Sequence, residues 1–540
     1  VNSPTYLEDQ HQLGDSLNQC PICGILFGKE IDPNRHINSC LDDFERHDSP
    51  KEKKDSITPE PVTTLATKTQ NKAESSSSTA LQLLPNRPTR GRYESLNDKE
   101  TPSNNDQKKA SSPSKRAKRK CPFYKWIQGI PFVVDAFSYG KIEKCEGYFL
   151  SHYHSDHYHG LSSSWKHGTI YCSKITANFL RQELDINKKY IVALPMDQDY
   201  ALNSFVNVCL IDANHCPGSV LFLFKVFRSD GSTVRHLHTG DFRANPRMCL
   251  HPLIRQPEND ILDTLYLDTT YLNGQYSFPA QEDVIKAACD LAERCVSGEQ
   301  GKNKSKWLYG WLGKIDRGNS DDKMSTDSVT KKTNSKVLII VGTYSIGKEK
   351  LFYHLAKRLN TKVYATPTKR RFITAQENKQ LDSLLTDDPF KAQIHLFPMG
   401  QIQEERLSLY LKSLSPHFTS AIAFRPTGWT FKKSSPAISS LATAPLEQIT
   451  SPPVDRIVVL NPQKSSIDTI KVYGVPYSEH SSFRELASFI ASLDVRRIIP
   501  TVNVGNEVSR QKMGAILQRW QNEKKKKGIQ LVSYPAEEHW

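Results

Sequence analysis

A cluster of metal-binding side chains follows an apolar run near residue 150. The run 147–150 predicts a short buried strand, and residues 151–157 read Ser-His-Tyr-His-Ser-Asp-His. His152 and His154 are two residues apart, so they point to the same side of an extended strand end. Imidazoles and carboxylates are ligands that zinc accepts, and the segment therefore predicts a metal site. Spacing alone leaves a solvated polar loop, or adventitious metal binding, as the alternative.

The length and charge of the chain indicate several domains and a polyanionic partner. Its 540 residues exceed one compact core, so two or three domains are expected. The hydrophobic content of 37% predicts some disordered segments, and the net charge of +14 favours nucleic acid or an acidic membrane surface. The sequence has no run long enough to span a membrane and starts without a secretory signal. The 11 cysteines form no regular disulfide framework, which favours a reducing intracellular compartment.

Four candidate zinc ligands lie close to the N-terminus. They are Cys20, Cys23, His36 and Cys40, with the spacing Cys-x2-Cys-x12-His-x3-Cys. This spacing predicts a ββα zinc finger over 20–45, after a disordered N-terminus over 1–19. The module resembles the ubiquitin-binding zinc fingers of DNA-repair proteins, which implies ubiquitin as a partner, with nucleic acid as the alternative. Asn38 stands where those fingers usually carry a ubiquitin-contacting aspartate.

Residues 46–120 predict a disordered basic linker. A serine run at 75–78, scattered prolines and Lys/Glu/Asn-rich stretches cannot bury a core. The linker ends in two basic clusters, 108–109 and 115–120, separated by residues 110–114. These clusters fit a bipartite nuclear import signal and a solvated tail equally well, and the first interpretation predicts a nuclear protein.

Polar residues gather just past four predicted strands after residue 121. They are Asp135 after 132–134, His152 after 147–151, His215 after 206–212, and Asp241 after 234–238. A strongly apolar strand is also predicted over 220–227. Polar side chains at strand ends, above an apolar sheet, are typical of a catalytic face. A capping or turn role explains one such residue better than it explains four together.

The order of these residues resembles the metallo-β-lactamase superfamily: Asp135, His152-x-His154-x-Asp156-His157, His215 and Asp241. Within that superfamily, the chain resembles the β-CASP nucleases of DNA interstrand cross-link repair, a group that contains Artemis. This narrower resemblance rests on the runs 265–271, 341–348, 424–429, 477–482 and 500–505. The resemblance implies an α/β fold, an αββα sandwich with a first part over 121–335 and a closing part over 473–540. It also implies an inserted β-CASP α/β domain over 336–472.

The resemblance further implies roles for individual side chains. It assigns His152, His154, His215 and Asp241 to one metal ion, expected to be zinc, and Asp156 and His157 to a second ion that Asp241 bridges. Asp135 and Asp268 are expected to orient histidines, and His480 to protonate the leaving 3′-oxygen. Val504 stands where RNA-cleaving relatives carry a histidine, which weakens the second site and favours DNA over RNA.

A strand, loop and helix are predicted over 337–341, 342–347 and 348–359. Backbone N–H groups at such a helix start can bind a phosphate, and the incomplete P-loop pattern argues against nucleotide hydrolysis. The resemblance implies a 5′-phosphate pocket made by Thr343, Ser345, Lys348 and Ser482. It therefore implies a 5′→3′ DNA exonuclease that acts in cross-link repair.

Three other functions fit parts of the pattern. Val504 argues against an RNA endonuclease on the same fold. The inserted domain, the net charge of +14 and the phosphate-type loop argue against a hydrolase of small thioesters or lactams. A ubiquitin-reading scaffold with an inactive nuclease lobe predicts no metal in 121–540, although the sequence contains all the ligands of the metal site.

Overall fold

The computed structural model describes residues 120–255, 261–297, 336–428, 441–452, 457–463, 466–467 and 469–532. The predicted zinc finger at Cys20, Cys23, His36 and Cys40 lies outside the described residues, as does the linker up to residue 119. Among the described helices, none is both long enough and apolar enough to span a membrane.

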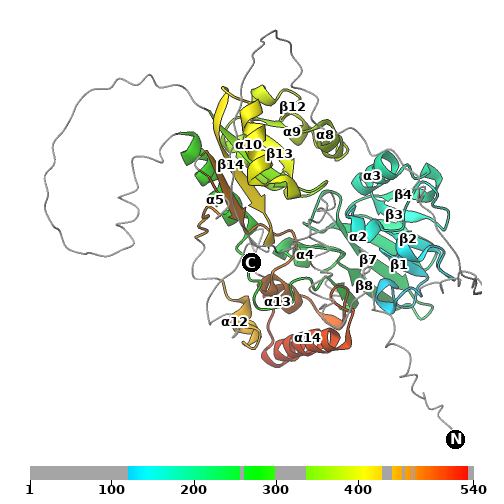
Figure 1. Ribbon diagram of the computed structural model, residues 1–540. Helices are drawn as coiled ribbons and strands as arrows, with labels where there is room; N and C mark the ends of the chain where they lie inside the picture. Colours follow the sequence, from blue (N-terminus) through cyan, green and yellow to red (C-terminus); the bar gives the residue numbers. More distant parts are fainter. Residues whose placement is uncertain are drawn as a thin grey trace, which may run out of the picture. The chain divides into compact units, whose positions relative to one another are not determined.

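Two sheets form what we call the sandwich lobe (Figure 1). The first sheet is parallel, in the order β1 (Phe132–Val134), β2 (Gly147–Phe149), β3 (Ile170–Ser173) and β4 (Ile191–Leu194). The second is mixed, in the order β16 (Val495–Pro500), β9 (Leu262–Leu267), β8 (Thr233–His238), β7 (Val220–Phe227), β6 (Val206–Asp212) and β5 (Asp199–Ala201). The predicted strands 206–212 and 220–227 coincide with β6 and β7.

Alternating side chains bury both faces of each sheet. In β1, Phe132 and Val134 pack between the sheets with Phe149, whereas Val133 packs outward, in one core cluster with Phe179 of α3 (Lys174–Leu184). On the outer face of the second sheet lie α4 (Pro246–Leu250), α13 (Phe483–Ser492) and α14 (Glu507–Lys527). The predicted αββα sandwich is therefore confirmed.

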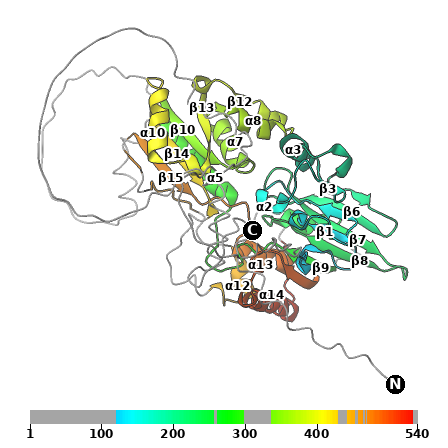
Figure 2. The ribbon, with the colours of Figure 1, turned by 45° about the vertical axis from the view of Figure 1, so that its right-hand side comes forward.

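The inserted lobe is built on a third, wholly parallel sheet (Figure 2). Its order is β12 (Leu385–Thr386), β11 (Lys362–Tyr364), β13 (Ala392–Pro398), β10 (Lys336–Thr343), β14 (Phe418–Pro426) and β15 (Ile470–Val475). One face packs against α5 (Gln281–Val296) and α7 (Glu349–Arg358), and the other against α10 (Glu404–Ser413). A parallel sheet covered on both faces is typical of α/β domains.

The inserted lobe extends beyond the predicted range 336–472. Helix α5 comes before that range and packs on the inserted sheet, and β15 continues to Val475. The predicted helix 348–359 is slightly shorter, because Lys348 adopts a left-handed conformation with φ of 69° and caps α7.

Short elements complete the chain: α2 (Ser155–Tyr158), α8 (Pro367–Thr374), α9 (Lys379–Asp382) and α12 (Leu446–Thr450), with the 3-10 helices η1 (Phe123–Lys125), η2 (Phe137–Tyr139), η3 (Lys188–Tyr190), η5 (Pro389–Lys391) and η6 (Met399–Gln401). Helices α3 and α8 join the two lobes, since Arg371 donates to Glu183 over 2.8 and 2.7 Å.

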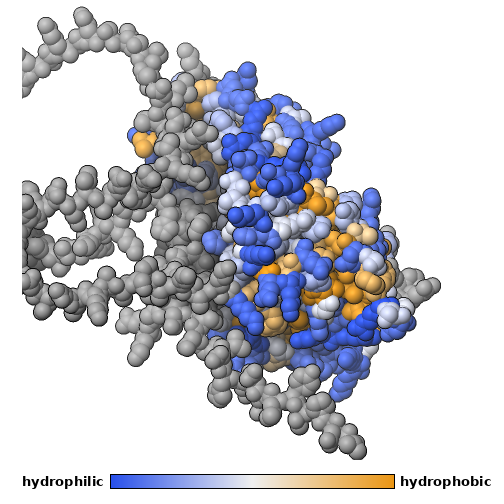
Figure 3. Space-filling view, turned by 90° about the vertical axis from the view of Figure 1, so that its right-hand side faces the viewer, coloured by the Kyte–Doolittle hydropathy of each residue, from blue (hydrophilic) through white to orange (hydrophobic). Residues whose placement is uncertain are grey.

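On the face in Figure 3, hydrophobic residues gather in the lower half, among hydrophilic ones. Exposed apolar area is common on folded proteins, so these residues alone do not indicate a binding site.

Candidate metal centre

The topology brings the ends of several strands to one edge of the sandwich. Strands β1 and β2 are parallel, so Asp135 and Ser151 follow them on the same side. Strands β8 and β9 are also parallel, and Asp241 and Asp268 follow them. Asp135 has a φ of 51°, a left-handed conformation that aspartate tolerates better than most residues. These local turns aim polar side chains into one space.

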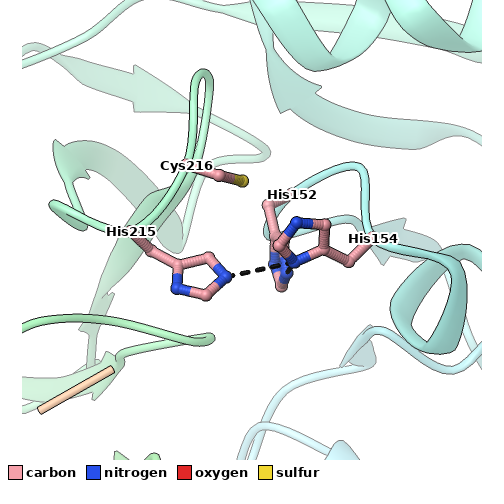
Figure 4. Close-up of side chains that lie close together, drawn as sticks. All are labelled: His152, His154, His215 and Cys216. Carbon is pink, nitrogen blue, oxygen red and sulfur yellow. Dashed lines mark hydrogen bonds between the residues drawn. The ribbon is translucent and has the colours of Figure 1, made fainter. Parts of the chain in front are cut away.

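Three imidazole rings converge in that space (Figure 4). His152 Nε2 lies 2.9 Å from His154 Nδ1, which lies 3.1 Å from His215 Nε2. The Cys216 side chain belongs to the same cluster, with ligand atoms within 4.8 Å of one another. A tetrahedral zinc ion with Zn–N bonds of about 2.0–2.1 Å separates its ligand atoms by about 3.3 Å. The three nitrogen atoms are therefore spaced almost as such an ion requires.

Hydrogen bonds on the outer side of two rings fix which nitrogen faces inward. The Ser151 hydroxyl donates to Asp135 Oδ2 over 2.7 Å, so it accepts from His152 Nδ1 at 2.9 Å. His215 Nδ1 donates to the carbonyl oxygen of Glu479 over 2.8 Å. Both partners require a proton on the outer Nδ1. The Nε2 lone pairs of His152 and His215 consequently point at the centre, as metal binding requires.

His157 and Asp241 form the second part of the centre. His157 Nδ1 donates to Asp135 Oδ2 over 2.7 Å, and its Nε2 lies 3.2 Å from Asp241 Oδ2 and 3.3 Å from Asp156 Oδ2. The same Asp241 oxygen lies 3.7 Å from His152 Nε2 and 3.9 Å from His215 Nε2. Asp241 therefore stands between the three-histidine cluster and His157.

His480 approaches the same oxygen from the segment after β15. Its Nε2 lies 3.9 Å from Asp241 Oδ2, and its Nδ1 donates to Asp268 Oδ2 over 2.9 Å. The other oxygen of Asp268 accepts from the backbone N–H and hydroxyl of Thr270 at 2.9 and 2.6 Å. The ring of Tyr271 packs edge-on against His480, with centroids 5.9 Å apart. His480 is thus held in one orientation with one nitrogen open to the centre.

Burial and charge divide the histidines into two classes. Desolvation lowers the pKa of His152 well below its ordinary value, and it lowers those of His154 and His215 to about 3. Desolvation also opposes charge on His157 and His480, but nearby carboxylates outweigh it. Asp241, Asp156 and Asp135 raise the pKa of His157, whereas Asp268 and Asp241 raise that of His480. The first three rings are therefore neutral ligands at neutral pH.

The donor set fits a metal ion. Neutral imidazole nitrogens and a carboxylate are the ligands expected for zinc. Three groups of described residues could each hold an ion: His152, His154, His215 and Cys216; His152, His157 and Asp241; and His215, Asp241 and His480. Val504 instead packs against the core beneath α13 and α14, so it contributes no donor.

The four predicted phosphate-binding residues lie in different surroundings. Thr343, Lys348 and Ser482 are buried, whereas Ser345 is exposed. Ser482 caps α13 in a reciprocal capping box with Glu485. Lys348 Nζ lies 2.9 Å from Glu479 Oε2, and both side chains are buried. Lys348 and Ser482 are thus already engaged by protein groups.

Three residues of the centre had no predicted role. Ser151 links Asp135 to His152, and Glu479 receives the His215 hydrogen bond through its backbone. Cys216, which directly follows His215, belongs to a candidate ligand group. Ser151 and Cys216 each neighbour a predicted ligand in sequence, which is the only signal that could have found them.

The chain is similar in sequence to several known proteins. Residues 379–506 match the family model described as DNA repair metallo-β-lactamase. The chain is 37% identical to the DNA cross-link repair protein pso2/snm1 of Schizosaccharomyces pombe over 517 residues, which covers 94% of this chain and 79% of that protein. It is 38% identical over 410 residues to the DNA cross-link repair protein SNM1 of Arabidopsis thaliana, covering 76% and 72%. It is 30% identical over 384 residues to the 5′ exonuclease Apollo of Danio rerio, covering 70% and 52%.

Two of these relatives exceed 30% identity, and this chain spans more than two thirds of their length. The chain belongs to the DNA repair metallo-β-lactamase family.

Proposed function

We propose that this protein is a zinc-dependent nuclease that removes nucleotides from the 5′ end of DNA during interstrand cross-link repair. One observation carries the proposal. The inner nitrogens of His152, His154 and His215 converge beside Asp241, and outer hydrogen bonds hold the rings of His152 and His215 in the ligand tautomer.

His152, His154, His215 and Asp241 would hold the principal zinc ion, and Asp156 and His157 would hold a second ion with Asp241. Zinc supplies Lewis acidity towards a phosphate oxygen and lowers the pKa of a water molecule to about 7. Asp135 keeps His157 oriented directly and His152 through Ser151. Such outer hydrogen bonds fix ring orientation and raise ligand basicity.

His480 is proposed to donate the proton that the leaving 3′-oxygen needs. Its raised pKa, caused by Asp268 and Asp241, favours the protonated ring, and its Nδ1–H bond to Asp268 directs Nε2 to the centre. A general acid must carry its proton at the working pH and reach the leaving atom. Asp268 thus stabilises the positive charge of His480 and fixes the orientation of its ring.

Action at a 5′ end is supported by the family and by the loop before α7. Apollo of Danio rerio is named a 5′ exonuclease. The proposed 5′-phosphate pocket comprises Thr343, Ser345, Lys348 and Ser482, at the junction of the two lobes. Lys348 and Ser482 are engaged by glutamates, and the backbone N–H groups of Gly347 and Lys348 donate to Glu349 and Glu479. The exposed Ser345 is therefore the member of this pocket best placed to receive a phosphate.

The first 120 residues of the chain complete the proposal. Cys20, Cys23, His36 and Cys40 would bind a structural zinc ion, and the finger over 20–45 would recruit the enzyme through ubiquitin or a ubiquitinated repair factor. The basic clusters before residue 121 would direct the protein to the nucleus, where its DNA substrate lies. Finger binding to ubiquitin is testable by titration of labelled ubiquitin against wild type and Cys20→Ser.

The deciding experiment uses single-stranded DNA labelled at its 3′ end, with and without a 5′-phosphate. Chelator-treated protein is assayed before and after zinc is restored, and Asp241→Ala is the control variant. We expect stepwise shortening from the 5′ end that depends on the phosphate and on zinc and is absent in the variant. Internal cleavage that ignores the phosphate would refute the exonuclease assignment. Intact DNA with every metal would refute nuclease activity.

A further inference from the structure

A strip of aromatic and cationic side chains lies beside the metal centre and has no role in the chemistry above. Its members are Phe123, Tyr124 and Lys125 of η1, Arg497 of β16 and Arg510 of α14. We call it the η1 strip. Phe123 is 64% exposed, and Arg497 is exposed as well.

Hydrogen bonds and electrostatic contacts connect the members of the η1 strip. Gln128, three residues after η1, donates its backbone N–H to Tyr266, and Arg497 lies 3.5 Å from the Gln128 side chain. Arg510 donates to the backbone oxygen of Val504 at 2.7 Å, and its charge is close enough to oppose the burial that raises the pKa of Tyr124. The strip therefore joins the start of the sandwich lobe to its closing part.

Among the described residues, the hydrogen-bond partners of the three cations of the η1 strip are neutral oxygen atoms. Lys125 donates to the backbone oxygen of Asp135 at 2.7 Å, and the partners of Arg497 and Arg510 are an amide and a carbonyl oxygen. Within the described part of the chain, none of the three forms an ion pair with a carboxylate, in contrast to the neighbouring Arg496, which pairs with Asp263 at 2.9 Å. Such a surface favours a polyanion.

The η1 strip reaches the centre through a small cavity. Tyr124 and Lys125 line this cavity of about 40 Å³ together with His157 and Asp241. His480 is not among the residues that line it. The cavity thus places the strip beside Asp241 on a side other than that of His480.

The proposed reaction assigns a different part of the DNA to each side, and this step rests on the proposed function. His480 protonates the 3′-oxygen of the nucleotide that leaves, so the leaving nucleotide lies on the His480 side. The retained strand begins at the attacked phosphate and continues away from it in the 3′ direction. It needs a separate path along the sandwich lobe.

We propose that the η1 strip binds the retained single strand of DNA on the 3′ side of the scissile phosphate. Phe123 offers a face on which a base stacks, and Lys125, Arg497 and Arg510 meet successive phosphates. Aromatic stacking combined with a cationic track is the usual way to hold a single strand without reading its sequence. An enzyme that digests any sequence requires such a non-specific contact.

Substrate length tests the proposal. The substrates are 5′-phosphorylated oligothymidylates from a dinucleotide to a dodecamer, and kcat/KM is measured for full-length wild type and for Phe123→Ala/Arg497→Ala. Lys125 is left intact because it also holds Asp135. For wild type, kcat/KM is expected to rise with length and then level off. The double variant is expected to match wild type on the dinucleotide and to fall about tenfold on the dodecamer.

A matched control separates this effect from general loss of surface charge. Phe390→Ala/Arg406→Ala removes a phenylalanine that is 49% exposed and an exposed arginine from the inserted lobe, and it should follow wild type at every length. Arg497→Ala alone should reduce the slope of log affinity against log salt by about 0.7, the value of one phosphate contact on a single strand.

Several outcomes would overturn the proposal. One is a double variant that matches wild type at every length, and another is equal loss on the dinucleotide and the dodecamer. Binding of the same oligomers, measured by fluorescence anisotropy in an Asp241→Ala background, decides the matter even if no DNA is cleaved. If no DNA is cleaved, the proposed nuclease activity is refuted. Unchanged binding of the oligomers by the double variant would separately refute the binding of DNA by the η1 strip.

Discussion

Lys348 and Glu479 form a buried ion pair, with 2.9 Å between Nζ and Oε2, that joins the inserted lobe to the segment carrying His480. Glu479 also accepts the backbone N–H of Lys348 at 2.7 Å. Through its carbonyl oxygen, Glu479 orients His215. Glu479 therefore connects the contact between the lobes directly to His215, a proposed zinc ligand.

The first prediction concerns Lys348→Met. This change leaves the Glu479 carboxylate buried without its partner, so the free energy of unfolding should fall by about 3–5 kcal/mol. Chemical denaturation measures the loss, and metal analysis should show less zinc because His215 loses its support. Lys350→Met is the control, since Lys350 is exposed and its hydrogen bonds among the described residues go to the side-chain amides of Asn214 and Gln281. Unchanged stability in Lys348→Met with a selective loss of 5′-phosphate preference would instead assign Lys348 to the phosphate.

The second prediction concerns Ser151→Ala. The change removes the hydroxyl that connects Asp135 to His152, so the His152 ring loses the partner that fixes its tautomer. Changes of this kind typically weaken metal binding about 10–100-fold. Zinc affinity is measured by competition with a chromogenic chelator. Ser492→Ala removes an equally buried hydroxyl at the far end of α13 and should leave zinc affinity unchanged. Equal affinities in the two variants would contradict the role of Ser151.

How much of this centre was predictable depends on the distance over which each contact acts. His152 and His154 were found because their spacing is local, and β7 was found because its eight residues are almost continuously apolar. The Lys348–Glu479 pair joins residues 131 positions apart, and no local pattern connects them. Similarly, α5 reads as an ordinary amphipathic helix, and only packing assigns it to the inserted sheet. Sequence motifs therefore indicated the candidate ligands and the orienting residues Asp135 and Asp268, whereas only tertiary contacts reveal the parts played by Ser151 and Glu479.

The third prediction concerns pH. Desolvation opposes charge on His480, but Asp268 and Asp241 outweigh it and raise its pKa. As pH increases through that raised pKa, His480 loses the proton that it donates, so kcat should fall on the alkaline side. Asp268→Asn removes the carboxylate that contributes most to the raised pKa, and the alkaline limb should move to lower pH. His480→Ala should lower kcat about 10²–10⁴-fold and abolish that limb.

The pH prediction is measured as kcat against pH at saturating DNA and zinc. Thr270→Val serves as a control, because it removes one hydrogen bond to Asp268 but keeps the carboxylate charge. It should leave the limb much closer to its wild-type position than Asp268→Asn does. An alkaline limb that stays in place in Asp268→Asn, or that persists in His480→Ala, would show that another group donates the proton.

The fourth prediction concerns Gly240, which lies between β8 and Asp241. Its φ is +55°, and an added Cβ would stand 2.7 Å from the Cβ of Ser151, closer than such atoms approach. Gly240→Ala should therefore displace Ser151 or Asp241 and lower both stability and zinc content. Gly231→Ala provides the control, since Gly231 also has a positive φ, +81°, but no atom within 4 Å of the added carbon. The control should lose about 1–2 kcal/mol from backbone strain alone and keep its zinc. If both variants lose stability equally and both retain zinc, the close approach of Gly240 to Ser151 does not determine the geometry of the centre.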